Sequence, residues 1–415
     1  MMKPSFDHAL RYTVHTLCAT PLRTGDAMNN VDSILYAWNG RPFLQGSSLA
    51  GALRSWSGDE QLFGVNAREG QLIISDLMFD SAALSKTRPR LRINGATGAA
   101  YDDGKFDVTY LPTGTKGSFE LIWKGFGDSG DAQIKIERML SALHRGLIHL
   151  GAQKSNGFGR VELSVRRMSY DLTSADGLAA WLEDRIGDEI VLNDISGEMV
   201  CFKVTAQIDS LLIKSAVGEG VGEHGVDAVQ LTENGIPVIP GSSLKGSLRN
   251  RITMMAPYRG ISREELDSLF GRANSGDDNG IAGKVRFSDA VIKCENEAPK
   301  VTRIRINRFT GGVIRAALFS ERPVSGSCSF EITLPADQTT GCALVALALR
   351  DLGVGFFNIG GGFAVGRGRL SGLTARITAP DGSAAMECRS DGHAVTVSDA
   401  DGLLKGWLGN GGDGQ

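Results

Sequence analysis

Two glycine-serine motifs contain the residues of this chain best suited to bind a phosphate. Residues 46–48 and 241–243 both read Gly-Ser-Ser, and each is followed by two leucines four positions apart. This spacing predicts that each motif begins an amphipathic helix, whose first backbone N–H groups lack partners and lie at the positive end of the helix dipole. Such an end attracts anions, so both motifs are candidate phosphate sites, with a simple helix cap as the alternative. Lys245 adds positive charge to the second motif, where the first has Ala50.

These motifs belong to a larger unit that occurs twice in the chain. Residues 42–54 and 237–249 match over the whole motif, and further matches follow in the same order on both sides of it. They pair Val31-Asp32 with Val226-Asp227, 62–64 with 269–271, Ser75-Asp76 with Ser288-Asp289, 90–94 with 303–307, 118–120 with 329–331 and 157–160 with 366–369. Convergent turn chemistry explains one glycine-rich motif but not this ordered series, so the chain contains two copies of one structural unit.

The composition is that of an ordinary globular protein with room for two cores: 415 residues, 42% hydrophobic and 22% charged. The six cysteines form no Cys-x-x-Cys pair, so we expect neither a disulfide framework nor a structural zinc site. No apolar run approaches a membrane span and the first residues are polar, so the expected location is the cytoplasm, without membrane contact. A net charge of −3 gives no general affinity for nucleic acid, and local charge must decide that question.

The densest basic stretches, residues 86–92 and 300–308, fall at equivalent places in the two copies. In an extended strand, Arg90 and Arg92 would share one face and Leu91 the other. This pattern suits a strand or hairpin laid along phosphates. A charged edge strand that blocks aggregation is the alternative, and repetition of the pattern in both copies disfavours it.

The order of elements is also repeated: strand, helix, short strands around the basic segment, helix, glycine-rich turn and closing strand. This order predicts an α+β fold with two tandem ferredoxin-like units. We expect the first unit over residues 1–168, a linker with a possible helix over 169–198, the second unit over 199–379, and a C-terminal extension with a flexible end over 380–415. The glycine-rich turns are interpreted either as close-packed turns or as a second backbone grip on a ligand.

In this order, the motifs resemble those of the RAMP superfamily of CRISPR systems, and within it the repeated backbone subunit of type III effector complexes. The second copy carries the pattern closely. The first departs from it with Gln45 in place of proline, Ala50 in place of lysine, and residues 101–110 in place of an Ala-Leu-Phe segment. Because backbone subunits usually contain one unit, the chain is similar to the tandem fusions of some type III subtypes.

The resemblance implies RRM-like units that grip CRISPR RNA, each with a β-hairpin thumb that folds over the guide and flips out one base. The thumbs correspond to roughly residues 86–115 and 300–322. The family's catalytic aspartate lies in the Val-Asp loop, which assigns cleavage of paired target RNA to Asp32 and Asp227, with a divalent metal ion, magnesium or manganese, held by the same residues. The expected partners are CRISPR RNA, complementary target RNA and other type III CRISPR subunits.

The RNA contacts that we expect come from the glycine-serine motifs, the basic stretches and the glycine-rich turns. They are Gly46, Ser47, Ser48, Arg54, Arg90, Arg92, Gly157, Gly159, Arg160, Gly241, Ser242, Ser243, Lys245, Arg249, Arg303, Arg305, Arg308, Gly360, Gly361, Arg367 and Arg369.

Two other functions stay open. An aspartate after valine in a polar loop is often only a turn residue, and then the chain is an inactive RNA scaffold. A guide-processing endoribonuclease of the same superfamily usually relies on a histidine near the first helix, and no histidine directly follows either Gly-Ser-Ser motif. His144, His149 and His224 are the histidines near motifs, with His224 a minor candidate for metal or RNA contact.

Overall fold

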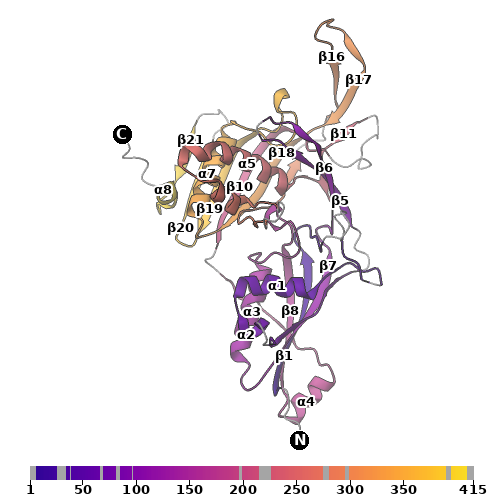
Figure 1. Ribbon diagram of the computed structural model, residues 1–415, viewed down its shortest axis with the longest axis vertical. Helices are drawn as coiled ribbons and strands as arrows, with labels where there is room; N and C mark the ends of the chain where they lie inside the picture. The colour runs from indigo at the N-terminus through magenta and orange to yellow at the C-terminus, as the bar shows by residue number, and fades with distance from the viewer. Residues whose placement is uncertain are drawn as a thin grey trace. The chain divides into compact units, whose positions relative to one another are not determined.

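The structure is a computed structural model, and its chain divides into two compact units that are described separately (Figure 1). Unit 1 contains residues 1–87, 108–154 and 158–196, and unit 2 contains 88–107, 155–157 and 197–415. The residues described are 6–25, 34–37, 39–65, 69–80, 85–95, 97–195, 199–214, 226–273, 280–294, 299–388 and 394–408. Within these ranges, no helix has the length and apolar character needed to cross a membrane.

Unit 1 is an antiparallel sheet with helices against one face. Its strands are β1 (His8–Cys18), β2 (Phe43–Leu44), β3 (Leu72–Ile74), β4 (Leu77–Phe79), β7 (Lys116–Gly125), β8 (Val161–Asp171) and β9 (Asp188–Ile190). They lie in the order β2-β4-β7-β1-β8-β9, and β3 also pairs with β7. The helices are α1 (Gly46–Ser57), α2 (Glu60–Phe63), α3 (Gly130–His144) and α4 (Ala175–Leu182). The 3-10 turn η1 (Lys154–Asn156) lies between α3 and α4 in the chain, and its last two residues belong to unit 2.

The core of unit 1 follows from sequence alternation. Along β1, Tyr12 and Val14 are buried whereas Thr13 and His15 are not. The buried face packs on an apolar stripe of α1 that includes Leu49 and Leu53. The sheet thus has one covered face and one polar face.

Unit 2 repeats this plan on a larger scale. Its main strands are β12 (Thr232–Glu233), β13 (Ile236–Ile239), β14 (Arg286–Phe287), β15 (Ala290–Cys294), β18 (Val324–Pro335), β10 (Met199–Leu211), β19 (Leu370–Ala379), β20 (Gly382–Cys388) and β21 (Val395–Ser398). The order is β12-β13-β15-β18-β10-β19-β20-β21, with β14 also on β18. The helical segments are α5 (Gly241–Met255), η3 (Ala256–Arg259), α6 (Arg263–Phe270), α7 (Thr339–Gly353), η4 (Phe363–Val365) and α8 (Leu403–Leu408). Helices α5 and α7 pack against each other beside the sheet (Figure 1).

Five strands occupy matching positions in the two units. In unit 1, β2, β4, β7, β1 and β8 are neighbours in this order, and in unit 2 the corresponding order is β13, β15, β18, β10 and β19. In each set, the strand that comes first in the chain, β1 or β10, lies between two strands that come later, β7 and β8 or β18 and β19. The observed fold is therefore mixed α+β, built twice.

Each copy also contributes a hairpin outside its main sheet. One consists of β5 (Lys86–Ile93) and β6 (Ala100–Tyr110), and the other of β16 (Val301–Ile306) and β17 (Val313–Arg322), which projects from unit 2 (Figure 1). Both turn on an asparagine: the N–H of Gly98 donates to the carbonyl of Asn94 at 2.8 Å, and the N–H of Gly311 donates to that of Asn307 at 2.9 Å. The glycines have φ of 67° and 65°, which explains the repeated Thr-Gly pair.

The C-terminal extension is more structured than its polar, glycine-rich sequence predicts. Strands β20 and β21 add two members to the sheet of unit 2, and α8 buries Leu403 and Leu404 in the core. Within the extension, residues 389–393 and 409–415 lie outside the described residues. Helix α4 overlaps the helix expected in the linker, and β8 extends into that segment as far as Asp171.

Candidate nucleic-acid interface

The Asp227 loop is fixed to the base of the β16–β17 hairpin. The N–H of Asp227 donates to the carbonyl of Ser320 at 2.8 Å, and the N–H of Ser320 donates to Oδ2 of Asp227 at 2.7 Å. Directly after Asp227, β11 (Ala228–Val229) pairs in parallel with β17. Asp227 itself is exposed. The hydrogen bond to Oδ2 therefore orients the Asp227 carboxylate, and the side chain is exposed to solvent beside a basic hairpin.

Glu321, the residue after Ser320, forms a buried ion cluster. It accepts hydrogen bonds from Arg367 Nη1 at 2.7 Å and from Arg303, and Lys214 Nζ lies 4.0 Å from its other oxygen. Burial alone would raise the pKa of Glu321, but the bonds from Arg367 and then Arg303 outweigh burial and hold this pKa below its usual value. The cluster joins three segments: Glu321 from β17, Arg303 from β16, and Arg367 from the glycine-rich turn.

Unit 1 fills the same positions with aromatic rings. Counting from the matched Ser118 and Ser329, Glu321 corresponds to Tyr110, and within the matched glycine-rich turns Arg367 corresponds to Phe158. The rings of Tyr110 and Phe158 are 5.6 Å apart and both are buried. A charged contact in one copy is thus an aromatic contact in the other.

Asp32, the other expected catalytic residue, and His224 lie outside the described residues. His144 and His149 have structural roles. His144 Nδ1 accepts from the N–H of Leu163 at 2.9 Å, and His149 Nδ1 lies 2.7 Å from the carbonyl of Phe158.

Both glycine-serine motifs do begin helices, but the structure gives their glycine amides a carboxylate partner. The N–H of Gly46 donates to Asp76 Oδ1 at 2.7 Å, and that of Gly241 donates to Asp289 Oδ1 at 2.8 Å. A phosphate at these amides would have to displace a carboxylate of the protein. The prediction that the two glycine amides bind phosphate is therefore corrected: they anchor the helices.

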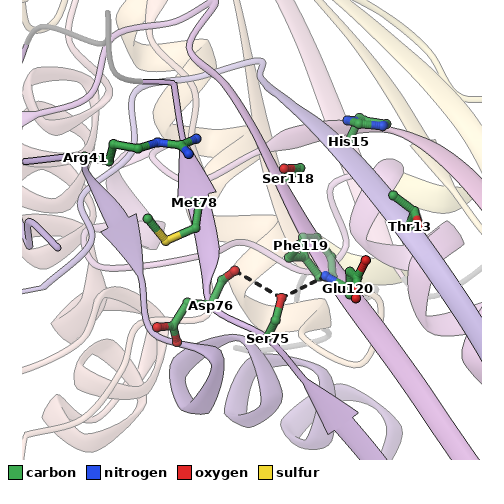
Figure 2. Close-up of a pocket in the computed structure, with 9 residues that line it drawn as sticks. All are labelled: Thr13, His15, Arg41, Ser75, Asp76, Met78, Ser118, Phe119 and Glu120. Carbon is green, nitrogen blue, oxygen red and sulfur yellow. Dashed lines mark hydrogen bonds between the residues drawn. The ribbon is translucent and has the colours of Figure 1, made fainter. Parts of the chain in front are cut away.

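The aspartates are held by the serines that precede them. Ser75 Oγ accepts from the N–H of Glu120 at 2.8 Å and donates to the carbonyl of Asp76 at 3.2 Å, as the dashed lines in Figure 2 show. In unit 2, Ser288 makes the same pair of bonds with Glu331 and Asp289, at 2.8 and 3.1 Å. The repeated Ser-Asp pair thus links a helix start to the neighbouring strand: the aspartate accepts from the first glycine of the helix, and the serine accepts from a residue of the strand.

The remaining motif serines stay near the surface. Ser47 and Ser48 are exposed, whereas Ser242 and Ser243 are half-buried. The N–H groups of Ser48 and Ser243 donate to the carbonyls of Gln45 and Pro240, the residues directly before their helices, at 2.9 and 2.8 Å. Their hydroxyl groups are what these helix starts offer to a ligand, whereas exposed Arg54 lies in the last turn of α1.

Three expected RNA-binding residues of unit 2 form one positive cluster. Lys245 Nζ donates to Ser155 Oγ at 2.8 Å, and Arg249 and Arg90 are close enough to act on its charge. Burial, followed by repulsion from Arg249 and Arg90, lowers the pKa of Lys245 to about 8. Such a site is stabilised by a bound anion. By its contacts, residue 90 belongs to unit 2 although it precedes β10 in the chain.

Arg88, which was not singled out from the sequence, is buried in unit 2. Its guanidinium lies 2.9 Å from Glu233 Oε2 and 2.7 Å from Asp289 Oδ2, so Asp289 binds Gly241 through one oxygen and Arg88 through the other. The basic stretch around residues 86–92 therefore contains a structural arginine. In the sequence, the one indication of a role for Arg88 is the alternation that places it on the same strand face as Arg90 and Arg92.

The hairpins keep other arginines at the surface. Arg92 lies over the Tyr101 ring at 4.7 Å, and Arg305 and Arg308 are exposed on and beside β16. Arg303, by contrast, is committed to Glu321. Phe309 at the tip of the second hairpin has 99% of its side chain exposed. The exposed arginines and this ring suit phosphates and bases.

The glycine-rich turns are mainly close-packed. Gly159 and Gly368 have φ of 88° and 78°, and a Cβ on either would lie about 2 Å from a carbonyl oxygen, at 2.0 Å from Leu150 and 1.9 Å from Ile359. Gly157 is similarly confined within unit 2, by the Phe287 carbonyl at 2.2 Å. Arg367 is buried, which leaves no surface for RNA. The positions at or near the surface are Gly360, Gly361, Arg160 and Arg369, of which Arg160 is half-buried.

Within the described ranges, no group of three or more His, Cys, Asp or Glu side chains is arranged to hold a metal ion. Asp227 offers one carboxylate. A magnesium or manganese ion fits such a site only if phosphate oxygens and water supply most of its ligands, as is common for Mg²⁺ on nucleic acids and nucleotides.

Comparison with known proteins supplies the family. The model of the RAMP superfamily matches residues 17–162 and 204–371, one region in each copy and more than half of the chain. A search of curated proteins found no match. Membership of this superfamily implies a CRISPR-associated RNA-binding subunit, with CRISPR RNA and other CRISPR subunits as partners. The chain belongs to the RAMP superfamily and contains two of its units in tandem.

Proposed function

We propose that this chain is a backbone subunit of a type III CRISPR effector complex, which holds the guide RNA and cleaves complementary target RNA. The observation that carries the proposal is the repetition, within the two RAMP regions, of one strand order and one basic hairpin outside the main sheet. In this proposal each unit is ferredoxin-like, or RRM-like, and each hairpin is a thumb that flips one base out of the guide.

The guide would be bound by local clusters of positive charge, although the net charge of the whole chain is −3. Lys245, Arg249 and Arg90 repel one another at a half-buried site, so a phosphodiester there relieves the repulsion and restores the ammonium of Lys245. Arg305 and Arg308 on the second hairpin add exposed positive charge. A row of such contacts binds the backbone of RNA without reading its sequence.

Asp227 is the proposed catalytic residue of unit 2, and by repetition Asp32 is that of unit 1. The flipped base would leave the target strand distorted, with its phosphate in reach of the carboxylate. The 2′-oxygen attacks the phosphorus and the P–O5′ bond breaks. The 2′-hydroxyl loses a proton and the 5′-oxygen gains one, which leaves a 2′,3′-cyclic phosphate and a 5′-hydroxyl. Asp227 holds or accepts the proton of the 2′-hydroxyl.

A divalent metal ion would be held by Asp227 together with RNA phosphates, and when bound it would neutralise charge on the reacting phosphate. The protein's own contribution is positional, because the bond from Ser320 holds one oxygen and leaves the other for the ligand or proton. The expected partners remain guide RNA, target RNA and other type III subunits in a cytoplasmic ribonucleoprotein.

The test uses the assembled complex. We expect a discrete guide RNA to co-purify with it, and we expect Asp227→Asn to abolish target cleavage at one position while guide and target binding are unchanged. Asp32→Asn is the matched variant in the other unit. Product ends analysed as 2′,3′-cyclic phosphates would support the proposed chemistry. Unchanged cleavage in the Asp32→Asn/Asp227→Asn double variant would make the chain an inactive scaffold, and absence of guide RNA would overturn the proposal as a whole.

A further inference from the structure

We infer that Glu321 is a positioning residue for the Asp227 site, and that this device belongs to unit 2 alone. The inference rests on the proposed function, because it concerns the same cleavage reaction. It implies that efficient cleavage at the unit 2 position depends on the orientation that this residue gives to the Asp227 carboxylate.

The first step is the connection between Glu321 and Asp227. Ser320, the residue before Glu321, exchanges two hydrogen bonds with Asp227, one of them to the carboxylate. Glu321 itself is opposite Ala228 in the parallel pairing of β11 with β17. The position of β17 at these two residues therefore sets the position of the loop and the direction of the carboxylate.

The second step is that the ion cluster fixes this part of β17. Arg303 and Arg367 reach Glu321 from different segments, and Asn358 Nδ2 donates to the carbonyl of Arg367 at 2.7 Å. Glu321 and Arg367 are both buried, with 4% and 6% exposed. Directional bonds to a buried carboxylate permit one arrangement of the three segments, whereas an apolar contact tolerates several. A catalytic group displaced by about 1 Å loses roughly 100-fold in rate, so this restriction matters for chemistry.

The third step is the difference between the copies. Tyr110 and Phe158 occupy the positions of Glu321 and Arg367, so unit 1 closes the same contact by ring packing. The tandem chain therefore contains a natural replacement for the ion pair, already packed in the same fold. This replacement supplies a test in which packing and positioning are separated.

The experiment compares variants in the assembled complex, with single-turnover cleavage of saturating labelled target and guide RNA content as the readouts. We expect Glu321→Gln to slow cleavage at the unit 2 position by roughly 10–100-fold, the usual effect of losing a residue that orients a catalytic group. We expect the double variant Glu321→Tyr/Arg367→Phe to retain guide RNA and to cut as slowly. Asp351→Asn, which breaks the buried contact with Arg251 at 2.7 Å elsewhere in unit 2, is the matched control and should cut normally.

The outcomes distinguish the two proposals. If Asp227→Asn cuts at the original rate, the proposed function fails at this site. If Asp227→Asn is inactive but the Tyr/Phe double variant cuts at the original rate, Glu321 contributes packing only and the positioning role is wrong. Loss of guide RNA from both Glu321 variants would equally overturn that role, since it would make the residue a general structural requirement.

Discussion

Asp289 Oδ1 accepts the N–H of Gly241 at 2.8 Å, at the start of the first helix of unit 2. Asp76 and Gly46 repeat the contact in unit 1 at 2.7 Å. The repeated glycine is thus explained by how closely the helix start approaches the neighbouring strand. A Cβ on Gly241 would lie 2.3 Å from the Phe287 carbonyl, and one on Gly46 would lie 2.6 Å from that of Ile74.

Within α1, two glycines should respond oppositely to alanine. Gly46→Ala should lower the free energy of unfolding of the chain by about 1–3 kcal/mol, because the methyl group meets backbone that cannot move freely. Gly51→Ala has open space around its new Cβ and should raise the same free energy by up to about 1 kcal/mol. Urea unfolding measures both. Equal effects of the two variants would refute the close-approach explanation.

Guide RNA affinity should fall as pH rises through the pKa of Lys245. The pKa of Lys245 in the folded chain, about 8, lies below the usual lysine value of 10.5, so the folded chain loses this proton at a lower pH than the unfolded chain does. The free energy of unfolding therefore rises between pH 8 and 10.5, because the folded chain has released a proton that the unfolded chain still holds. Over the same range, the chain loses the ammonium group that would bind a phosphate. RNA binding should weaken by about tenfold between pH 7 and 9. Lys245→Arg stays charged and should remove this pH step; an unchanged step would assign it to another group.

Phosphate contacts by the second hairpin should be visible in the salt dependence of RNA binding. For Arg305→Ala/Arg308→Ala we expect the slope of log affinity against log salt to decrease by about 0.7 for each lost contact with single-stranded RNA. Arg263→Ala, an exposed arginine on α6, is the control and should leave the slope unchanged. The prediction fails if the hairpin and control variants have the same slope.

The ring of Phe309 should stack on a base of the guide or target. Phe309→Ala should leave the unfolding free energy unchanged, since 99% of the side chain is exposed, and should weaken RNA binding by about 1–3 kcal/mol. Tyr258, which is 90% exposed on η3, provides a matched aromatic. Titration of labelled RNA into each variant complex is the measurement, and an equal effect of Tyr258→Ala would argue against a specific role of the hairpin tip.

The sequence was a good guide wherever the two copies could be compared locally. Both helix starts, both basic hairpins and the order of the elements followed from alternation, leucine spacing and repeated turns. Strands β20 and β21 and helix α8 were not expected, because the polar and glycine-rich composition after residue 380 concealed Leu403 and Leu404, whose burial depends on the sheet of unit 2.

The site was predictable in its parts but not in its connections. The Ser75-Asp76 pair was recognised as repeated, yet its partner Gly46 lies 30 positions away, and nothing in local spacing indicates which group the carboxylate meets. Arg303 was assigned to RNA because it lies in a basic stretch, and Arg367 because it lies in a glycine-rich turn. Their common partner Glu321 is 46 residues from Arg367, and only the folded sheet brings the two together.

The exchange of Glu321 and Arg367 for Tyr110 and Phe158 has a consequence for the inheritance of the tandem gene. Repeated sequences recombine with each other, and a crossover between these two positions would join the first part of one copy to the last part of the other. One product would combine Tyr110 with Arg367 and bury the arginine without Glu321. The other would combine Glu321 with Phe158 and leave the buried carboxylate with Arg303 but without its bond from Arg367. Selection against such products would keep the two copies from being homogenised, and would preserve two distinct units in one chain.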